Sequence, residues 1–246
     1  MITTDLGSAE AAIEAHSPAM RSLLRTIAKV ASHDVPVLFR GECGSGKGVL
    51  ARALHAASPR QAHPLVAIDC QALQADASRS GRALVEKLEE GRWGTVLLEE
   101  VGALPDRVQV TVASLLEQHR LGQRTADVRV IATSHRDLET AVRQGKFRGE
   151  LLGRLNVVEL RVPPLRDRPE DVLPLARRFL AAVSDGTERT IPELTPRAQQ
   201  ALLAYSWPGN IRELRNAMQH ALVFSRGDVL DLDALPSRLS SPRAVR

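Results

Sequence analysis

The feature that most constrains the fold is a glycine-rich segment between two regular elements, Gly41-Glu42-Cys43-Gly44-Ser45-Gly46-Lys47-Gly48. The apolar run at 35–40 predicts a buried strand before it, and residues 48–57 have helical periodicity after it. Glycines let the backbone turn tightly so that N–H groups converge, and the following helix presents its positive end. This order predicts a phosphate-binding loop, with Lys47 reaching the β- and γ-phosphates of a nucleoside triphosphate. A strand-to-helix turn without a ligand is the alternative.

The first two thirds of the chain alternate short β-branched runs with helical stretches. This alternation predicts an α/β fold, a parallel sheet sandwiched by helices. The expected strands are 35–40, 65–70, 95–98, 128–133 and 157–162. The expected helices are 19–31, 48–57, 81–90, 108–120 and 138–145.

The strand pattern stops at about Arg168. Helices are expected beyond it at 170–184, 196–205, 211–224 and near Leu232. We therefore expect a nucleotide-binding α/β domain over residues 1–167, a small helical domain over 168–239 and a polar tail over 240–246.

Two carboxylates, Glu99 and Glu100, follow the apolar run at 95–98. Ligands of open α/β sheets bind at the carboxyl ends of the strands. One carboxylate is then placed to hold Mg²⁺, and the other to orient or deprotonate an attacking water. A solvated strand end is the alternative, but the loop at Lys47 favours the functional interpretation.

The composition excludes several classes of protein. Hydrophobic residues make up 43% of the 246, as in globular proteins, and no apolar stretch approaches the roughly 20 residues of a membrane span. Two cysteines without a CxxC or HExxH pattern indicate neither a disulfide scaffold nor a metal site. The first ten residues contain no basic residue, which argues against a signal peptide. We expect a cytoplasmic protein with no membrane contact.

The charge pattern bears on nucleic-acid binding. The formal net charge is +4, and only four of the 33 basic residues are lysines. An arginine excess is one footprint of nucleic-acid binding. However, aromatic residues are only 3% of the chain and no basic run is interleaved with them, so base stacking has little to use. We expect no DNA binding by this chain alone.

At this point the chain resembles the AAA+ ATPase domain of bacterial enhancer-binding proteins, the activators of sigma-54 RNA polymerase. The resemblance runs from His16 to Leu239. Besides the glycine loop, it is carried by Arg52-Ala53-Leu54-His55, Pro64-Leu65-Val66-Ala67-Ile68-Asp69-Cys70, Val128-Arg129-Val130-Ile131-Ala132-Thr133, Phe147-Arg148, Arg154-Leu155-Asn156-Val157, Pro163-Pro164-Leu165-Arg166 and Trp207-Pro208-Gly209-Asn210-Ile211-Arg212-Glu213-Leu214. It implies a P-loop AAA+ module followed by a helical lid.

The resemblance also implies roles for individual residues. Glu99 is expected to hold Mg²⁺. The expected catalytic residues are Glu100 and two arginine fingers that reach a neighbouring subunit's nucleotide, Arg148 and Arg154. The expected ATP-binding residues are Gly41, Glu42, Cys43, Gly44, Ser45, Gly46, Lys47, Gly48, the sensor residues Ser134 and His135, and the second sensor Arg212 in the lid.

Local patterns offer other interpretations of the arginines. Asn210 and Glu213 form an N-x-x-E helix start, which predicts that Asn210 caps the helix. Arg212 then lies in the first turn, where the helix dipole disfavours a cation unless an anion such as a phosphate offsets it. An Arg212 side chain in water is the alternative. For Arg154 the alternative is a surface pair with Glu150, four residues earlier.

Several positions depart from the family pattern. Residues 71–93 contain no GAFTGA, the loop tip that contacts sigma-54, and form a shorter segment than in the family. Glu99 occupies a position where the family has Asp. Asp69 replaces an Asn that in the family interacts with the catalytic glutamate, so we expect the two carboxylates to repel each other or one of their pKa values to rise. Gly149 and Gly153 flank the fingers, each costing a helix interior about 1 kcal/mol relative to Ala.

These matches and departures lead to one expected function and one alternative. We expect an ATP-binding and ATP-hydrolysing AAA+ module of a bacterial transcription regulator, assembled with itself into a hexameric or heptameric ring. The missing GAFTGA loop argues against a contact with sigma-54, although RNA polymerase is a candidate partner. The alternative is a nucleotide-gated oligomerisation or interaction module with little or no hydrolysis.

Overall fold

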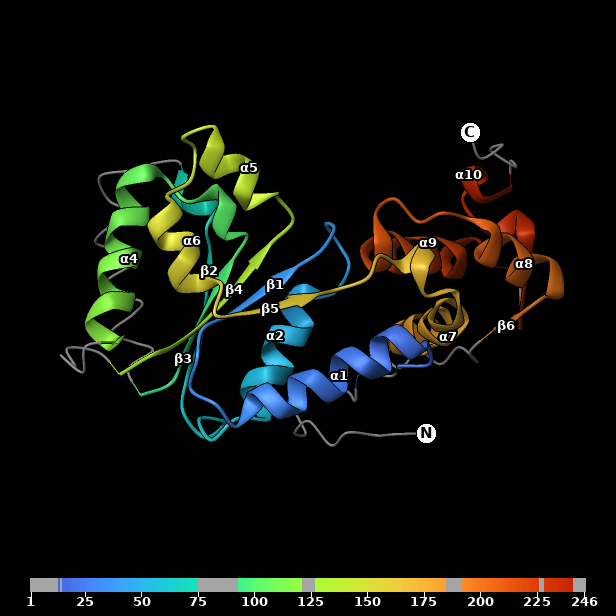
Figure 1. Cartoon of the computed structure of the whole chain (residues 1–246). Helices are drawn as coiled ribbons and strands as arrows, with labels where there is room; N and C mark the ends of the chain where they lie inside the picture. Colours follow the sequence, from blue (N-terminus) through green and yellow to red (C-terminus); the bar gives the residue numbers. More distant parts are fainter. Residues whose placement is uncertain are drawn as a thin grey trace. The chain divides into compact units, whose positions relative to one another are not determined.

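The sheet expected from the sequence is present in the computed structural model, which describes residues 13, 15–74, 93–120, 127–184, 192–225 and 228–240. Five parallel strands lie in the order β2-β3-β4-β1-β5 (Figure 1). The strands are β1 (Val37–Arg40), β2 (Leu65–Asp69), β3 (Thr95–Glu99), β4 (Arg129–Ser134) and β5 (Val158–Arg161). Each coincides with an expected strand, which confirms the α/β prediction.

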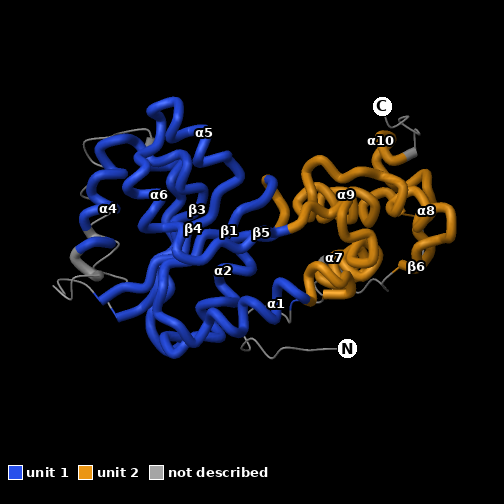
Figure 2. The backbone as a smooth tube through the Cα atoms, viewed as in Figure 1, with its two compact units in different colours: residues 1–13, 22–42, 46–162 blue, residues 14–21, 43–45, 163–246 orange. Residues whose placement is uncertain are grey.

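The chain divides into two compact units (Figure 2). Unit 1 comprises Met1–Ile13, Ser22–Glu42 and Gly46–Val162, and it contains the five-stranded sheet. Unit 2 comprises Glu14–Arg21, Cys43–Ser45 and Pro163–Arg246. The glycine loop therefore contributes its two ends to unit 1 and its tip, Cys43–Ser45, to unit 2.

Helices cover both faces of the sheet in unit 1. Figure 1 shows α2 on one side of the strands and α4 with α6 on the other. Along the strands, fully buried residues alternate in direction, such as Phe39 with Leu38 and Leu97 with Leu98. A parallel sheet buried on both faces needs such continuous apolar strands. The longer helices that involve unit 1 are α1 (Pro18–Ala31), whose first residues belong to unit 2, α2 (Lys47–Ala56), α4 (Asp106–Arg120), α5 (Leu138–Arg143) and α6 (Gly149–Leu155).

These helices agree with the expected ones in four cases, and the expected helix at 81–90 lies outside the described residues. Short 3₁₀ turns complete the unit at η1 (Ala72–Gln74) and η2 (Val101–Ala103). Within the described ranges, no helix is long and apolar enough to cross a membrane.

Unit 2 packs its helices around a separate core. Trp207 is 1% exposed and packs with residues such as Leu202, Leu214 and Met218. The indole N–H of Trp207 donates to the Leu202 carbonyl at 2.9 Å, so its polar atom is satisfied inside that core. The elements are η3 (Leu165–Asp167), η4 (Pro169–Asp171), α7 (Val172–Ser184), β6 (Glu193–Leu194), α8 (Pro196–Ala204), α9 (Asn210–Phe224), β7 (Val229–Leu230), η5 (Leu232–Ala234) and α10 (Ser237–Ser240).

The expectation of helices alone beyond Arg168 is wrong, because β6 and β7 form a small parallel sheet. The Glu193 N–H donates to the Asp228 carbonyl at 2.9 Å, and the Thr195 N–H donates to the Leu230 carbonyl at 3.0 Å. Each strand has only two residues, too few to show the period-2 alternation by which a strand is recognised.

Candidate functional site

The glycine loop joins β1 to α2 through two residues in the left-handed region. Gly44 has φ of +76° and Gly46 has φ of +102°, a conformation that glycine adopts without a steric penalty. Gly46 is the N-cap of α2 and provides no side-chain cap. The first N–H groups of α2 are therefore not satisfied by a capping side chain, as a helix that binds a phosphate at its N-terminus requires.

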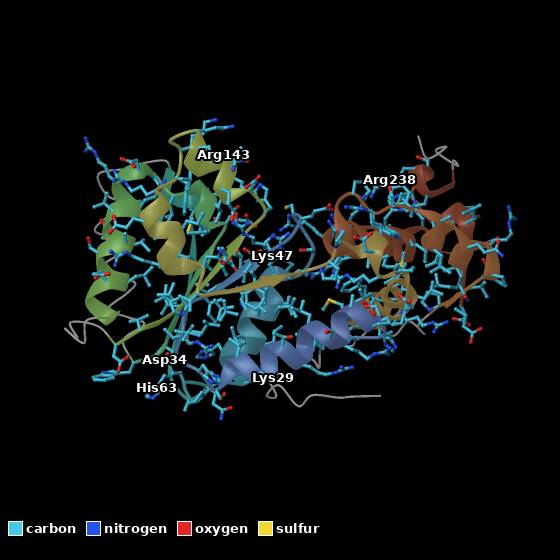
Figure 3. The ribbon with its side chains drawn as sticks, in the orientation of Figure 1. Lys29, Asp34, Lys47, His63, Arg143 and Arg238 are labelled. Atoms are coloured by element: carbon cyan, nitrogen blue, oxygen red, sulfur yellow. The ribbon has the colours of Figure 1, made fainter. Side chains whose placement is uncertain are left out.

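Lys47, the first residue of α2, is 5% exposed and labelled in Figure 3. Its Nζ donates to the carbonyl oxygens of Gly41 at 2.9 Å and Glu42 at 3.1 Å. The same nitrogen lies 3.1 Å from Oε1 of Glu100, beyond the end of β3. The loop lysine and the second strand-end carboxylate, which the sequence assigns to one nucleotide site, are in contact.

Glu100 is held in place by three residues from two segments of the chain. Its backbone has φ of +57°, and its N–H donates to Oγ1 of Thr133 on β4 at 3.0 Å. Its Oε2 accepts from the His135 N–H at 2.9 Å and lies 2.5 Å from His135 Nδ1. Burial acts to raise the pKa of Glu100, but Lys47 and the hydrogen bonds from His135 outweigh it and hold that pKa below the usual glutamate value.

Of the two expected consequences of Asp69, repulsion or one raised pKa, a raised pKa is not found at Glu100. Asp69 is exposed at the end of β2, in register with Glu99, and its Oδ1 accepts from the Gln71 N–H at 2.9 Å. Lys47 supplies the compensating charge at Glu100.

Ser134 and His135, the expected sensor residues, do different things. Ser134 is buried, and its hydroxyl is used within its own turn, where it donates to the Arg136 carbonyl and accepts from the Arg136 N–H. The Ser134 carbonyl accepts from the Gly41 N–H at 3.2 Å, which ties β4 to the start of the loop. Of the two side chains, only that of His135 reaches the Glu100 carboxylate.

Glu99 lies at the end of β3 and pairs with Arg52 of α2, with Oε1 3.1 Å from Nη2. Within the described residues, no group of three or more His, Cys, Asp or Glu side chains is placed to hold a metal ion by itself. Mg²⁺ in nucleotide sites keeps several waters and takes one or two carboxylates plus phosphate oxygens. The carboxylate of Glu99, an oxygen ligand beside a phosphate-binding loop, fits that requirement. It does not fit a metal site in which protein side chains supply all the ligands.

The two expected fingers are both ion-paired. Arg148 makes two hydrogen bonds to the exposed Asp106, each at 2.9 Å. Arg154 pairs with Glu150 at 2.6 Å, as its local alternative predicts, and also with Glu117 of α4. The pair with Glu117 crosses between helices, so spacing along α6 did not indicate it.

The loop tip makes its contacts within unit 2. Asn210 Nδ2 donates to the Cys43 carbonyl at 3.0 Å, and the Ile211 N–H donates to the Gly44 carbonyl at 3.0 Å. Arg212, exposed in the first turn of α9, donates to Sγ of Cys43 at 3.0 Å. Arg212 and the first residues of α9 therefore contact the loop tip, Cys43–Ser45, which belongs to the same unit.

The prediction that Asn210 caps α9 is wrong. Asn210 has φ of +53°, and Gly209 is the N-cap. The Asn210 Oδ1 accepts instead from the Leu165 N–H at 2.7 Å, and its Nδ2 donates to the Cys43 carbonyl. Both ends of this fully buried amide therefore have partners that are distant in the sequence. Glu213 does reach back, accepting from the Gly209 N–H at 2.8 Å. A Pro-Gly-Asn run, which favours turns with left-handed residues, was the available signal.

Arg168 is a contact residue that the sequence patterns missed. It is 2% exposed, and its Nη2 donates to the Ser45 carbonyl at 2.7 Å. Burial lowers the pKa of Arg168, and the nearby Asp171 opposes that change. No local periodicity distinguishes this arginine from the many on the surface.

Comparisons with known proteins agree on one family. The model of the sigma-54 interaction domain matches residues 15–165, and that of the AAA+ ATPase lid domain matches 166–246. The chain is 40% identical to the transcriptional regulatory protein ZraR of Klebsiella oxytoca, covering 95% of this chain and 57% of that protein. It is 40% identical to the sigma54-dependent transcriptional regulator SfnR of Pseudomonas fluorescens, covering 93% and 67%.

A solved structure is similar over the same span. NtrX from Brucella abortus, in a complex with ATP, superposes with a TM-score of 0.83 at 31% identity, covering 94% of this chain and 56% of that one. The chain thus spans little more than half the length of ZraR and NtrX.

Proposed function

This chain belongs to the sigma-54 interaction domain family of AAA+ modules in bacterial transcriptional regulators, and on that basis we propose that it binds ATP with Mg²⁺ and hydrolyses it. Residues 1–167 would form the nucleotide-binding domain and 168–239 the lid. The observation that carries the proposal is the contact between Lys47 of the glycine loop and Glu100, which directly follows β3. The solved ATP complex of NtrX, which is 31% identical to this chain, supports it.

The loop residues Gly41–Gly48 would bind the phosphates through backbone N–H groups and Lys47. Glu99 would hold the nucleotide's Mg²⁺, which when bound neutralises charge on the phosphate oxygens. Ser134, His135 and Arg212 would complete the nucleotide contacts.

Glu100 would orient and deprotonate the attacking water. Its lowered pKa keeps the carboxylate ionised at neutral pH, as a base requires. Its position is defined by two partners, since Lys47 contacts Oε1 and His135 contacts Oε2. An acid held at both oxygens has little freedom to rotate away from the water it activates.

Arg148 and Arg154 would act on the nucleotide of a neighbouring copy in a hexameric or heptameric ring. An arginine that stabilises charge on a transferring phosphoryl group is worth about 10³–10⁵ in rate. Each finger would first have to leave the carboxylates that it contacts within unit 1. These pairs favour, as a second candidate, a nucleotide-gated interaction module with little hydrolysis.

We further propose that this module does not engage sigma-54 through a GAFTGA tip, because the sequence contains none. The segment that would carry it, residues 75–92, lies outside the described residues. RNA polymerase is a candidate partner by another contact.

The proposal is tested by ATP binding and phosphate release. By calorimetry, Lys47→Ala should lose at least about 100-fold in ATP affinity, since it removes the loop's charge from the phosphates. Glu100→Gln should bind ATP as the parent does but release no phosphate, because an amide cannot take a proton. Glu193→Gln, an exposed acid in unit 2, is the matched control. Parent-like ATP binding by Lys47→Ala would remove the basis of the proposal.

Dependence on protein concentration separates the two candidates. Fingers that act between copies require phosphate release per molecule to rise steeply with concentration. Arg154→Ala mixed with Lys47→Ala should recover activity, because some interfaces then pair an intact loop with an intact finger. As a control, Arg161→Ala changes an exposed arginine and should release phosphate without being mixed with a second variant. Activity that stays absent at every concentration and ratio favours the interaction module.

A further inference from the structure

Arg52 bridges the loop helix and the strand-end acid in unit 1. It lies one turn after Gly48 on α2, and its Nη1 donates to the Gly48 carbonyl at 3.1 Å. Its Nη2 donates to Oε1 of Glu99, also at 3.1 Å. Oε2 of Glu99 has no hydrogen-bond partner in the part of the chain that the structure describes. Arg52 therefore holds one carboxylate oxygen and leaves the other available.

Gly48 lies against both partners of this pair. A Cβ at residue 48 would lie 3.1 Å from Oε1 of Glu99 and 3.1 Å from Nη1 of Arg52. Contacts this short require the neighbours to move. The backbone does not explain the glycine, because the φ of Gly48 is not in the left-handed region and Ala is favoured over Gly in a helix. The space beside Gly48 is occupied by the Glu99–Arg52 pair.

Two departures from common patterns thus meet at one place. The general phosphate-loop signature has Ser or Thr after the lysine, and this chain has Gly48. A strand-end aspartate is one methylene shorter than Glu99. The longer acid reaches the place where a side chain at residue 48 would begin.

We propose that Gly48 and Arg52 are positioning residues for Glu99: the absent side chain gives the longer carboxylate room, and the arginine holds its Oε1 so that Oε2 faces the divalent cation of the bound nucleotide. This inference rests on the proposed function. It assigns residue 48 a steric role in place of the hydroxyl ligand of the general signature, and it makes the identities of residues 48 and 99 depend on each other.

A double-mutant cycle tests this dependence. The quantity measured is the ratio of ATP affinities in excess Mg²⁺ and in EDTA, by calorimetry. Gly48→Ala should reduce the ratio about threefold and Gly48→Val about tenfold. The ratio removes any effect that these substitutions have on phosphate binding itself. In a Glu99→Asp background, both should reduce it less than about twofold, because the shorter acid leaves space. Arg52→Gln should reduce the ratio about threefold only when Glu99 is present.

Controls separate positioning from folding. Gly153→Ala adds a Cβ in α6 with no atom within 4 Å, and Arg161→Gln removes an exposed arginine, so neither should change the ratio. The thermal midpoint of Gly48→Ala should equal or exceed that of the parent, because Ala favours the helix.

Two outcomes contradict the inference in distinguishable ways. If the Gly48 substitutions reduce the ratio equally with Glu99 and with Asp at that position, the two sites are independent and the coupling is wrong while ATP binding stands. If the parent protein binds no ATP with or without Mg²⁺, the proposed function fails and the inference with it.

Discussion

The base and the tip of the glycine loop are held by different kinds of contact. At the base, Lys47 in unit 1 is held by charge, through Glu100 at 3.1 Å and two backbone carbonyls. The tip, Cys43–Ser45, is held within unit 2 by hydrogen bonds to its backbone carbonyls. The three tip carbonyls accept from Asn210 Nδ2, the Ile211 N–H and Arg168 Nη2.

This difference indicates which changes each end tolerates. A lysine on a flexible stem exchanges one oxygen partner for another with little rearrangement, so the base suits an exchange of Glu100 for a phosphate. The tip depends on close backbone approach, since a Cβ on Gly44 would lie 2.3 Å from the Gly209 carbonyl oxygen. We therefore expect steric changes to act strongly at the tip, and charge changes to act at the base without disrupting the fold.

Gly44→Ala should have the largest effect on stability. It places a side chain at φ of +76° and against a backbone oxygen that has no flexible end to move. Strain and overpacking together should cost about 3 kcal/mol of the free energy of unfolding, measured by urea denaturation. A loss below about 1 kcal/mol would show that the tip is not closely packed.

Asn210→Ala should cost about 2 kcal/mol, because it leaves the buried Leu165 N–H and the Cys43 carbonyl without their partner. Asn216→Ala is the matched control, since Asn216 is exposed on the same helix. Equal urea midpoints for the two variants would mean that the Asn210 amide does not hold the tip.

Gly153→Ala should stabilise the protein by about 0.5–1 kcal/mol, because Ala favours a helix interior and the new Cβ meets no atom within 4 Å. It makes the same chemical change as Gly44→Ala, with the opposite sign expected. A decrease in the urea midpoint would show that α6 requires glycine for another reason, such as the placement of the neighbouring Arg154.

Glu100→Gln should have the smallest effect on stability, visible in acid. Because the pKa of Glu100 is lowered in the folded state, its stabilising contribution is present above the usual glutamate pKa of about 4.3 and is lost as the pH falls through the lowered value. The parent should therefore lose stability more steeply than Glu100→Gln as the pH is lowered from 5 to about 3. Parallel urea midpoints across that range would mean that Lys47 does not stabilise the ionised acid.

Sequence patterns predicted the sheet, and for a related reason they assigned Lys47 and Glu100 to one nucleotide site. The carboxyl ends of parallel strands lie at one edge, so residues that follow different strands become neighbours even when they are 53 positions apart. Sequence patterns did not predict contacts between residues that are far apart in the sequence and lie away from the carboxyl ends of the strands. Asn210 looked like a cap because its local spacing was right, yet its amide reaches Leu165 and Cys43. Glu117, the second partner of Arg154, lies on another helix.

The sequence by itself determined the five strands, four of the described helices of unit 1 and the loop between β1 and α2, because periodicity and turn residues are local properties of the chain. Its motifs, taken in order, also carried the resemblance to the AAA+ family. Only the tertiary structure decided which polar groups meet. In it, Glu100 contacts Lys47 and His135, and Glu99 contacts Arg52. The loop tip contacts Arg168 and Asn210. Each of these contacts joins residues that are far apart in the sequence, so the packing of the elements decides which of them meet.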